Sequence, residues 1–305
     1  MSLETDLLLD RRRLKRRLFF WRVAALGALL VAAGVGFGSV ASPGGRAHVA
    51  RLTVAGVITD DRKLIETIDA LAKRSTVRAV IVAIDSPGGS VAGGESLHAA
   101  IARVAAKKPV VAVMGATAAS AGYMIAMPAA RVFARDSTLT GSIGVLLQTA
   151  EISGLLSTIG ITAEAITSGP LKDQPSMTRG LSDPGRAVLH GMVMDMYDQF
   201  VGMVAAGRKM EPDRVRELAD GRAYTGRQAH KLGLVDEIGG EREARAWLAE
   251  AKQIPATLPI EDVERRSLTE RAFEGSVGSI LKTVLTQGLK LDGVLALWQP
   301  SLVGR

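Results

Sequence analysis

The sequence predicts an α/β fold, and two of its patterns carry that prediction. Short apolar runs rich in β-branched residues alternate with helical patterns of about a dozen residues, which is the order expected of βαβ units. The runs are apolar almost throughout, as in parallel strands that are buried on both faces. The expected strands are residues 49–58, 77–85, 109–115, 131–135 and 161–167.

Two amphipathic helices are expected between the first three strands, at residues 61–74 and 93–108. In the first of them, Leu64, Ile65, Ile68 and Leu71 recur at the spacing of one buried helix face. The helical patterns continue with few breakers at residues 183–218 and 239–253. We therefore expect the second half of the chain to be mainly α.

The N-terminus combines a basic cluster with a long uncharged segment. Residues 11–17 read RRRLKRR, and residues 23–40 carry no charge, which is just long enough to span a bilayer. By the positive-inside rule, we expect a cytoplasmic basic segment (1–17), one transmembrane anchor (18–41) and an extracytoplasmic remainder.

A cleaved signal peptide is the alternative to this anchor. Ser39 and Ala41 are small residues at the two positions that a signal peptidase inspects. The apolar segment is longer than the usual core of a signal peptide, and this length favours a retained anchor.

Composition narrows the classes of function. The chain has no cysteine, which excludes disulfides, zinc–thiolate sites and a cysteine nucleophile. Much of the net charge of +7 lies in the basic cluster beside the anchor, and no nucleic-acid motif is present, so we expect no nucleic-acid partner. After a linker (42–48), we expect a catalytic domain (49–260) and an amphipathic tail (261–305). The tail is expected to pack on the domain, with a partner subunit and the membrane as alternatives.

The first candidate catalytic feature is the glycine turn DSPGGS at residues 85–90. It follows a predicted strand and precedes a predicted helix, and active sites collect at such strand ends. Gly88 and Gly89 let bare backbone N–H groups approach a ligand, which suits an oxyanion hole. A plain strand-to-helix turn is the alternative.

The second feature is Ser120, which lies between small residues at the start of a predicted helix, residues 120–130. A serine at this position ordinarily caps the helix. The small neighbours also leave its hydroxyl open to a substrate, and the helix N-terminus supplies N–H groups and positive potential where an oxyanion would form. Spacing alone leaves both roles open.

A nucleophilic serine needs a base, and histidine is the usual one. None of the four histidines follows a strand in a way that would bring it to the serine: His48, His98, His190 and His230. Lys172 lies just past the predicted strand at 161–167. A lysine base requires burial, and lowering its pKa from about 10.4 to about 8 costs roughly 3 kcal/mol. A solvated loop lysine is the alternative.

Five motifs, taken in order, resemble those of the signal peptide peptidase A family of Ser-Lys proteases, in its short form. The resemblance covers about residues 49–253, and five ordered motifs are a specific signal. They are IDSPGGSVAGGESLH (84–98), GATAASAGYMIAMPA (115–129), TGSIGV (140–145), SGPLKDQPSMTRGLS (168–182) and GRAYTGRQAHKLGLVDEIGG (221–240).

The resemblance implies a role for each candidate residue. Ser120 would be the nucleophile and Lys172 the general base, and Ser142 would orient the lysine amine. Gly89 and Ala121 would donate the oxyanion N–H groups, and the turn that carries Gly88 would line the substrate groove. Ala121 departs from the family, which usually has glycine there, but a backbone N–H survives that change.

The resemblance also implies fold, substrate and location. The fold would be a Clp protease/crotonase-like ββα superhelix, and the substrates would be remnant signal peptides and similar apolar peptides. The enzyme would sit in the bacterial inner membrane with its catalytic domain in the periplasm. Short forms assemble into homo-oligomeric rings in which neighbouring subunits share active sites, and no metal or cofactor is required.

Two other functions stay open at this point. An acyl-CoA hydratase or isomerase shares the paired N–H oxyanion hole of the crotonase fold, but it needs neither Ser120 with Lys172 nor an anchor. A membrane scaffold without turnover would keep the fold, and the intact Ser120, Lys172 and Ser142 argue against it.

Overall fold

The computed structural model describes residues 17, 19–22, 25–27 and 46–263. Most of the predicted cytoplasmic segment, anchor and linker lie outside the described residues, as does the predicted tail from residue 264 onward. Among the residues that are described, no helix has the length and apolarity needed to cross a bilayer.

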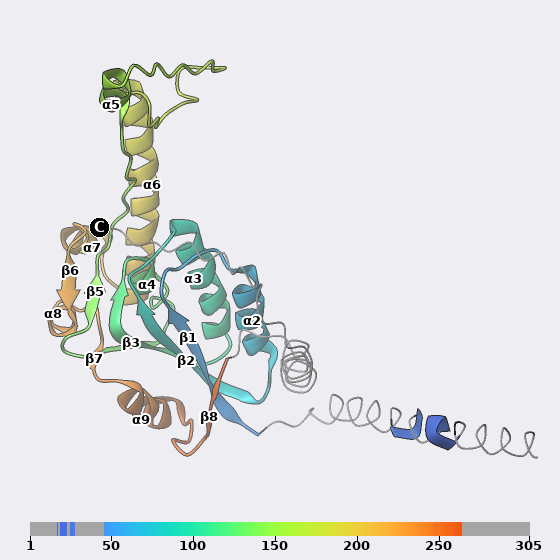
Figure 1. Cartoon of the computed structure of the whole chain (residues 1–305). Coiled ribbons are helices and arrows are strands. Elements are labelled where there is room, and N and C mark those ends of the chain that lie inside the picture. The colour runs from blue at the N-terminus through green and yellow to red at the C-terminus, as the bar shows by residue number, and fades with distance from the viewer. Residues whose placement is uncertain (1–16, 18, 23–24, 28–45, 264–305) are drawn as a thin grey trace, which may run out of the picture.

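The described chain alternates strands and helices, as the sequence predicted (Figure 1). One sheet of eight strands has the order β6-β5-β3-β2-β1-β8, and β4 pairs with both β3 and β7. The pairings are parallel except for β5 with β6. The elements are β1 (His48–Ala55), α2 (Arg62–Lys73), β2 (Val77–Ser86), α3 (Val91–Ala105), β3 (Val110–Ala119), α4 (Ala121–Met124), β4 (Arg131–Ala134), β5 (Leu139–Gly141), α5 (Ser153–Thr158), α6 (Asp183–Arg208), α7 (Pro212–Leu218), β6 (Ala223–Thr225), α8 (Gly226–Lys231), β7 (Glu237–Ile238), α9 (Glu241–Lys252) and β8 (Ile260–Asp262).

The central strands are buried on both faces, which explains their continuous apolarity. In β2, Val80 and Val82 face the core under α2 and α3, whereas Ile81 faces a second core under α9 (Figure 1). Phe133 of β4 is fully buried in the α9 layer, and truncating a side chain of this size costs about 3–5 kcal/mol. The two layers hold the strand ends rigidly, and the candidate site is built on those ends.

Two expectations for local structure are wrong. Residues 161–167 form no strand, because their apolar side chains find no sheet to cover: Ile166 is 97% exposed. The helix that follows Ser120 is only four residues long. The helical pattern expected at residues 183–218 is confirmed, and it is divided into two helices, since Lys209 adopts a left-handed conformation and α7 begins at Pro212.

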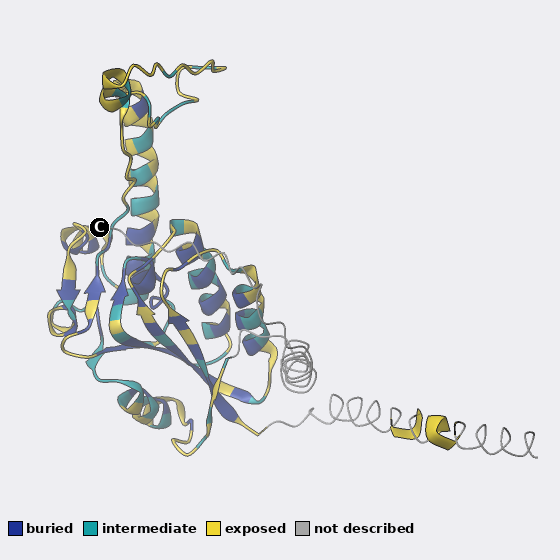
Figure 2. Cartoon of the chain, in the orientation of Figure 1, coloured by how far each residue is buried: buried dark blue, intermediate teal, exposed yellow. Residues whose placement is uncertain are grey.

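The chain between β5 and α6, with α5 and the N-terminal part of α6, forms an arm that stands away from the sheet (Figure 1). Within α6, the buried apolar side chains Phe200, Val201 and Val204 lie near its C-terminal end, and the rest of the helix is largely exposed (Figure 2). Many large apolar side chains of the arm face solvent, and such a surface marks an interaction site. They are Leu146, Leu147, Ile152, Leu155, Ile159, Ile161, Ile166, Leu171, Met177, Val188, Met192 and Met194.

Candidate active site

Three of the motifs noted in the sequence meet at one edge of the sheet. Ser86 at the end of β2 pairs with Ala118 of β3, and Ala119 of β3 pairs with Gly141 of β5. The turns that follow these three strands are therefore side by side, at the carboxyl edge where α/β sheets bind ligands. They carry Gly88, Ser120 and Ser142 respectively.

Ser120 lies in the strained turn between β3 and α4. Its φ of 54° and ψ of −122° are rare for residues other than glycine, and such a conformation costs about 1–3 kcal/mol. Its N–H donates a hydrogen bond to the Gly141 carbonyl (2.9 Å), which fixes the backbone. Its side chain makes no capping hydrogen bond to α4. A strained serine between strand and helix is the geometry that exposes a nucleophile in other hydrolases, and it does not support the helix-cap alternative.

Gly88 packs directly against Ser120. Its φ is +115°, and a Cβ placed on it would lie 2.8 Å from the Ser120 Cβ and 3.2 Å from the Ser120 Oγ. The buried Ser86 stabilises the turn, because its Oγ accepts a hydrogen bond from the Gly88 N–H (3.1 Å). Only glycine meets both requirements here, which are positive φ and close approach to the serine.

Gly89 directs its N–H away from the neighbouring chain segment. The Gly88 carbonyl accepts a hydrogen bond from the Ile58 N–H (2.8 Å), and the Ser90 N–H donates to the Ile58 carbonyl (3.0 Å). Since the C=O and N–H of one trans peptide point in opposite directions, the Gly89 N–H faces the side opposite Ile58. A Cβ on Gly89 would lie 1.9 Å from the Ile58 carbonyl oxygen, so no other residue fits.

Ala121 is the first residue of α4, so its N–H has no partner within the helix. Ala121 is not among the described residues with positive φ, so alanine fits at this position without backbone strain. Its methyl group packs on Gly94, where an added Cβ would lie 2.9 Å away. Because α4 has only four residues, its dipole adds little to the electrostatic potential at this N–H.

Ser142 follows β5 directly and has a φ of 48°. Its N–H donates a hydrogen bond to the Arg222 carbonyl (2.9 Å), and the preceding Gly141 carbonyl is bound to Ser120. The pairing of β3 with β5 therefore sets Ser142 beside Ser120. This placement suits a hydroxyl that would orient a third group at the nucleophile.

Lys172 is not at this edge of its own chain. Gln174, two residues after Lys172, accepts a hydrogen bond from the Ser182 N–H (3.2 Å). This bond holds the turn that contains Lys172, here called the lysine turn, at the start of α6. The other end of α6 approaches the segment after Ser120, since a Cβ on Gly207 would lie 2.7 Å from the Met127 carbonyl oxygen. At about 1.5 Å per residue, some 35 Å of helix separates these two ends. Lys172 is also exposed, so its own chain does not supply the burial that a lysine base requires.

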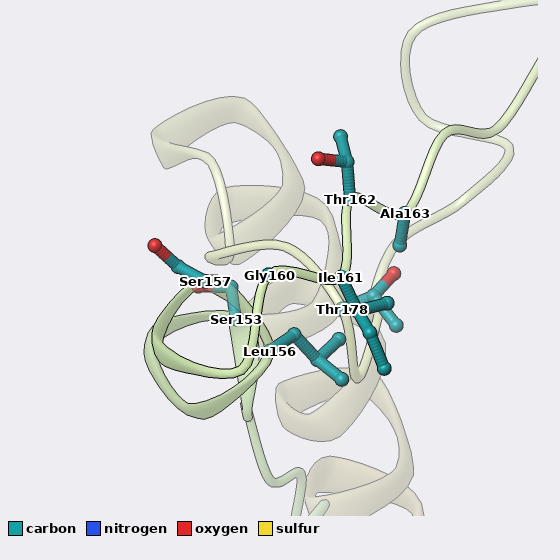
Figure 3. Close-up of a pocket in the computed structure, with 8 residues that line it drawn as sticks. All are labelled: Ser153, Leu156, Ser157, Gly160, Ile161, Thr162, Ala163 and Thr178. Carbon is teal, nitrogen blue, oxygen red and sulfur yellow. The ribbon is translucent and has the colours of Figure 1, made fainter.

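A cavity of about 380 Å³ lies on the arm (Figure 3). Its lining joins α5 to the irregular segment that was expected to be a strand, through residues such as Leu156, Gly160 and Ile161. None of the predicted site residues lines it. The cavity therefore adds nothing to the nucleophile and belongs to the exposed surface of the arm.

A buried network behind α4 was not foreseen from the sequence. The Tyr123 hydroxyl donates to the Leu234 carbonyl (2.7 Å), and the guanidinium of Arg208 binds both carboxylate oxygens of Asp236 (2.7 and 2.8 Å). Burial raises the pKa of Tyr123 and keeps its hydroxyl protonated. Burial acts to raise the pKa of Asp236, but the hydrogen bonds and charge of Arg208, the hydrogen bond from the Val132 N–H and the charge of Arg131 together outweigh burial and hold that pKa low. In the sequence, only the motif LGLVDEIGG (232–240) pointed to this region, and it does not indicate which residues would pair with Asp236 or Tyr123.

A strained serine at the carboxyl edge of an α/β sheet, with backbone N–H donors beside it, defines an α/β serine hydrolase. Comparison with known proteins narrows the class. The sequence profile of Peptidase family S49 matches residues 102–255. A protein of Synechocystis described as a protease is 36% identical over 80% of this chain and 91% of its own length. The chain therefore belongs to peptidase family S49, and it is a serine peptidase.

Other relatives carry names consistent with this family. A protein of Enterococcus faecium described as a signal peptide peptidase SppA is 34% identical, over 70% of this chain and 66% of its own. The chloroplastic serine protease SPPA of Arabidopsis thaliana is also 34% identical, and the match covers 70% of this chain and 32% of that one. Among solved structures, a ClpP1 variant from Listeria monocytogenes matches 63% of this chain and 92% of its own, with 18% identity and a TM-score of 0.42.

Proposed function

We propose that this peptidase is a membrane-anchored endopeptidase with a Clp protease/crotonase-like fold, in which Ser120 is the nucleophile and Lys172 of a second copy is the general base. One observation carries the proposal. Ser120 sits in a strained turn whose hydroxyl caps no helix, directly against the glycine turn that aims the Gly89 N–H away from Ile58. This arrangement supplies a nucleophile and an oxyanion hole together.

The chemistry follows from these groups. A neutral Lys172 amine takes the proton of the Ser120 hydroxyl as its oxygen attacks a peptide carbonyl. The Gly89 and Ala121 N–H groups stabilise the oxyanion, and the protonated lysine then gives its proton to the leaving amine. Water activated by the same lysine releases the acyl group from Ser120. Ser142, beside Ser120, orients the lysine amine throughout.

The separation of Ser120 from Lys172 supports a base that comes from another copy. The lysine turn is held at the N-terminal end of α6, whose other end lies near Ser120. Because the helix is rigid, it keeps Lys172 away from Ser120 of the same chain. The arm that carries Lys172 exposes many large apolar side chains, among them Ile166 at 97% and Leu146 at 81%. Packing such arms against neighbouring subunits in a ring would bury this apolar surface and the lysine together.

Substrate and location rest on the sequence and on relatives. The uncharged segment 23–40 behind a basic cluster supports a single span in the bacterial inner membrane, with the N-terminus in the cytoplasm and the peptidase in the periplasm. An enzyme held there meets signal peptides left in the bilayer after secretion, and one relative is described as a signal peptide peptidase. We therefore propose remnant signal peptides and similar apolar peptides as its substrates.

Complementation between two inactive variants tests the shared site. Ser120→Ala and Lys172→Ala are each expected to lose cleavage of a fluorogenic apolar peptide by at least 10³-fold, as loss of a nucleophile or its base does in other serine hydrolases. Subunits of the two variants, mixed after dissociation and reassembled, should recover part of the wild-type rate. Lys231→Ala, which removes another exposed lysine, is the matched control and should keep full activity.

The outcomes separate the parts of the proposal. Full activity of either single variant would reject the Ser-Lys dyad. Two inactive variants that fail to complement, although they form mixed assemblies, would place both residues of each site in one chain. A wild-type protein that cleaves no apolar peptide would instead favour a scaffold without turnover.

A further inference from the structure

A basic pocket lies at the edge of the sheet opposite Ser120. It is a cavity of about 300 Å³, formed between the end of α3, the start of β3 and the end of α9. Three of its lining residues are lysines, Lys107, Lys108 and Lys252, and Pro109 and Pro128 shape the rigid remainder. Neither the proposed mechanism nor the substrate groove uses this pocket.

Two arginines lie next to Lys108 at the rim of the pocket. The Lys108 ammonium donates to the carbonyls of Arg74 and Val77 (2.9 Å to the latter), which ties the end of α2 to the pocket. Burial lowers the pKa of Lys108 and the nearby Arg78 guanidinium lowers it further, so Arg78 lies close to the pocket as well. The Lys252 ammonium lies 5.7 Å from the centre of the Trp247 ring.

No acidic side chain among the described residues forms an ion pair with this cluster, which consists of Arg74, Arg78, Lys107, Lys108 and Lys252. Asp69 of α2 and Glu237 of β7 pair instead with Arg103 and Arg131. A concave site with uncompensated positive charge fits a phosphate group.

The topology places this pocket on the side from which the chain enters the domain. β1, β2 and β3 are parallel, so His48, Val77 and Val110 begin their strands at the same edge. The proposed anchor ends at residue 41, and seven further residues reach at most about 25 Å. The pocket must therefore stay close to the bilayer, while Ser120 lies about 30 Å away, at the other end of β3.

We propose that the basic pocket formed by Lys107, Lys108 and Lys252, with Arg74 and Arg78 at its rim, binds the phosphates of anionic phospholipid headgroups. Bound headgroups would hold this edge of the sheet on the membrane. The placement of this pocket at the membrane rests on the anchor in the proposed function. The binding of phosphate by the pocket does not depend on that anchor.

The test uses the full chain reconstituted into two kinds of vesicle, phosphatidylcholine alone and phosphatidylcholine with phosphatidylglycerol in equal parts. Hydrogen–deuterium exchange is followed at residues 103–110 and 247–254. The variant reverses two exposed charges, Lys107→Glu with Lys252→Glu. The matched control, Lys63→Glu with Lys231→Glu, makes the same change in net charge at exposed lysines that do not line the pocket.

We expect exchange in these segments to slow several-fold only with phosphatidylglycerol, and less so at high salt, because salt screens the attraction. The pocket variant should lose this protection and the control should keep it. Equal protection in both lipids, or protection that survives in the pocket variant, would overturn the proposal. So would tight binding of a labelled RNA oligonucleotide that needs Lys107 and Lys252, without lipid-dependent protection.

Vesicle flotation keeps the two proposals apart. An anchored chain floats with both kinds of vesicle, whatever the pocket does. A wild-type chain that floats only with phosphatidylglycerol would reject the anchor and still support the pocket. A chain that floats with both vesicles but shows no lipid-dependent protection would keep the anchor and reject the pocket.

Discussion

Replacing Gly88 with alanine tests whether the glycine turn and the serine form one catalytic unit. The new methyl group would lie 2.8 Å from the Ser120 Cβ and 3.1 Å from the Ala119 carbonyl oxygen, so the turn or the serine must shift. The φ of +115° adds backbone strain of about 1–3 kcal/mol. A shift of about 1 Å between reacting groups costs on the order of 10²-fold in rate. We therefore expect kcat to fall at least a hundredfold, with a smaller loss of folding stability.

The assay is kcat and KM for a fluorogenic apolar peptide, together with the thermal unfolding midpoint of the same preparation. Gly202→Ala is the matched control, because an added Cβ there meets nothing within 4 Å and the residue lies inside α6. Alanine inside a helix should raise stability by about 0.5–1 kcal/mol and leave kcat unchanged. Wild-type kcat in Gly88→Ala would refute the close packing of this turn against the nucleophile.

Three further predictions concern the residues around the serine. Tyr123→Phe removes the hydrogen bond to Leu234 and leaves a buried carbonyl unpaired, so calorimetry should show a loss of about 1–3 kcal/mol; an unchanged unfolding midpoint would contradict this. The folded-state pKa of Asp236 is lowered, so its contribution to stability is present above its unfolded pKa of about 3.9 and is lost as pH falls through the folded value. Between neutral and acidic pH, the thermal unfolding midpoint of Asp236→Asn should therefore change less than that of the wild type. This variant should also lose about 3 kcal/mol of stability at neutral pH, because Arg208 stays buried without its partner. The same pH dependence in both proteins would argue against this ion pair. Ser142→Ala should lower kcat about 10- to 100-fold at constant KM and move the basic limb of the pH–rate profile, whereas a purely structural role would lower stability and leave the profile in place.

The strands and helices near the sheet were predictable because their environment is uniform. Residues 77–85 are buried on both faces by α2, α3 and α9, so continuous apolarity and strand structure coincide. The prediction failed at residues 161–167, which are less continuously apolar because Thr162, Glu164 and Thr167 interrupt them, and which pair with no strand in the described part of the chain. An apolar sequence predicts that a side chain will be buried, but not which part of the protein or which partner buries it. We expect another copy of the chain to bury the exposed apolar side chains of the arm.

From the sequence alone came the family, which the comparisons confirm, and the candidate groups for the chemistry, which stay predictions: a serine between small residues, two glycines after a strand, and a lysine in place of a histidine. The sequence also left Ser120 open to a role as a helix cap, and only the backbone geometry at that residue decided against it. Tertiary structure further decided that Gly88 touches Ser120 and that Lys172 lies a full helix away. The reason is physical. Residue types and local spacing fix what each group can donate or accept, whereas the distance between groups is set by strand register and by the length and direction of α6, which no short motif encodes.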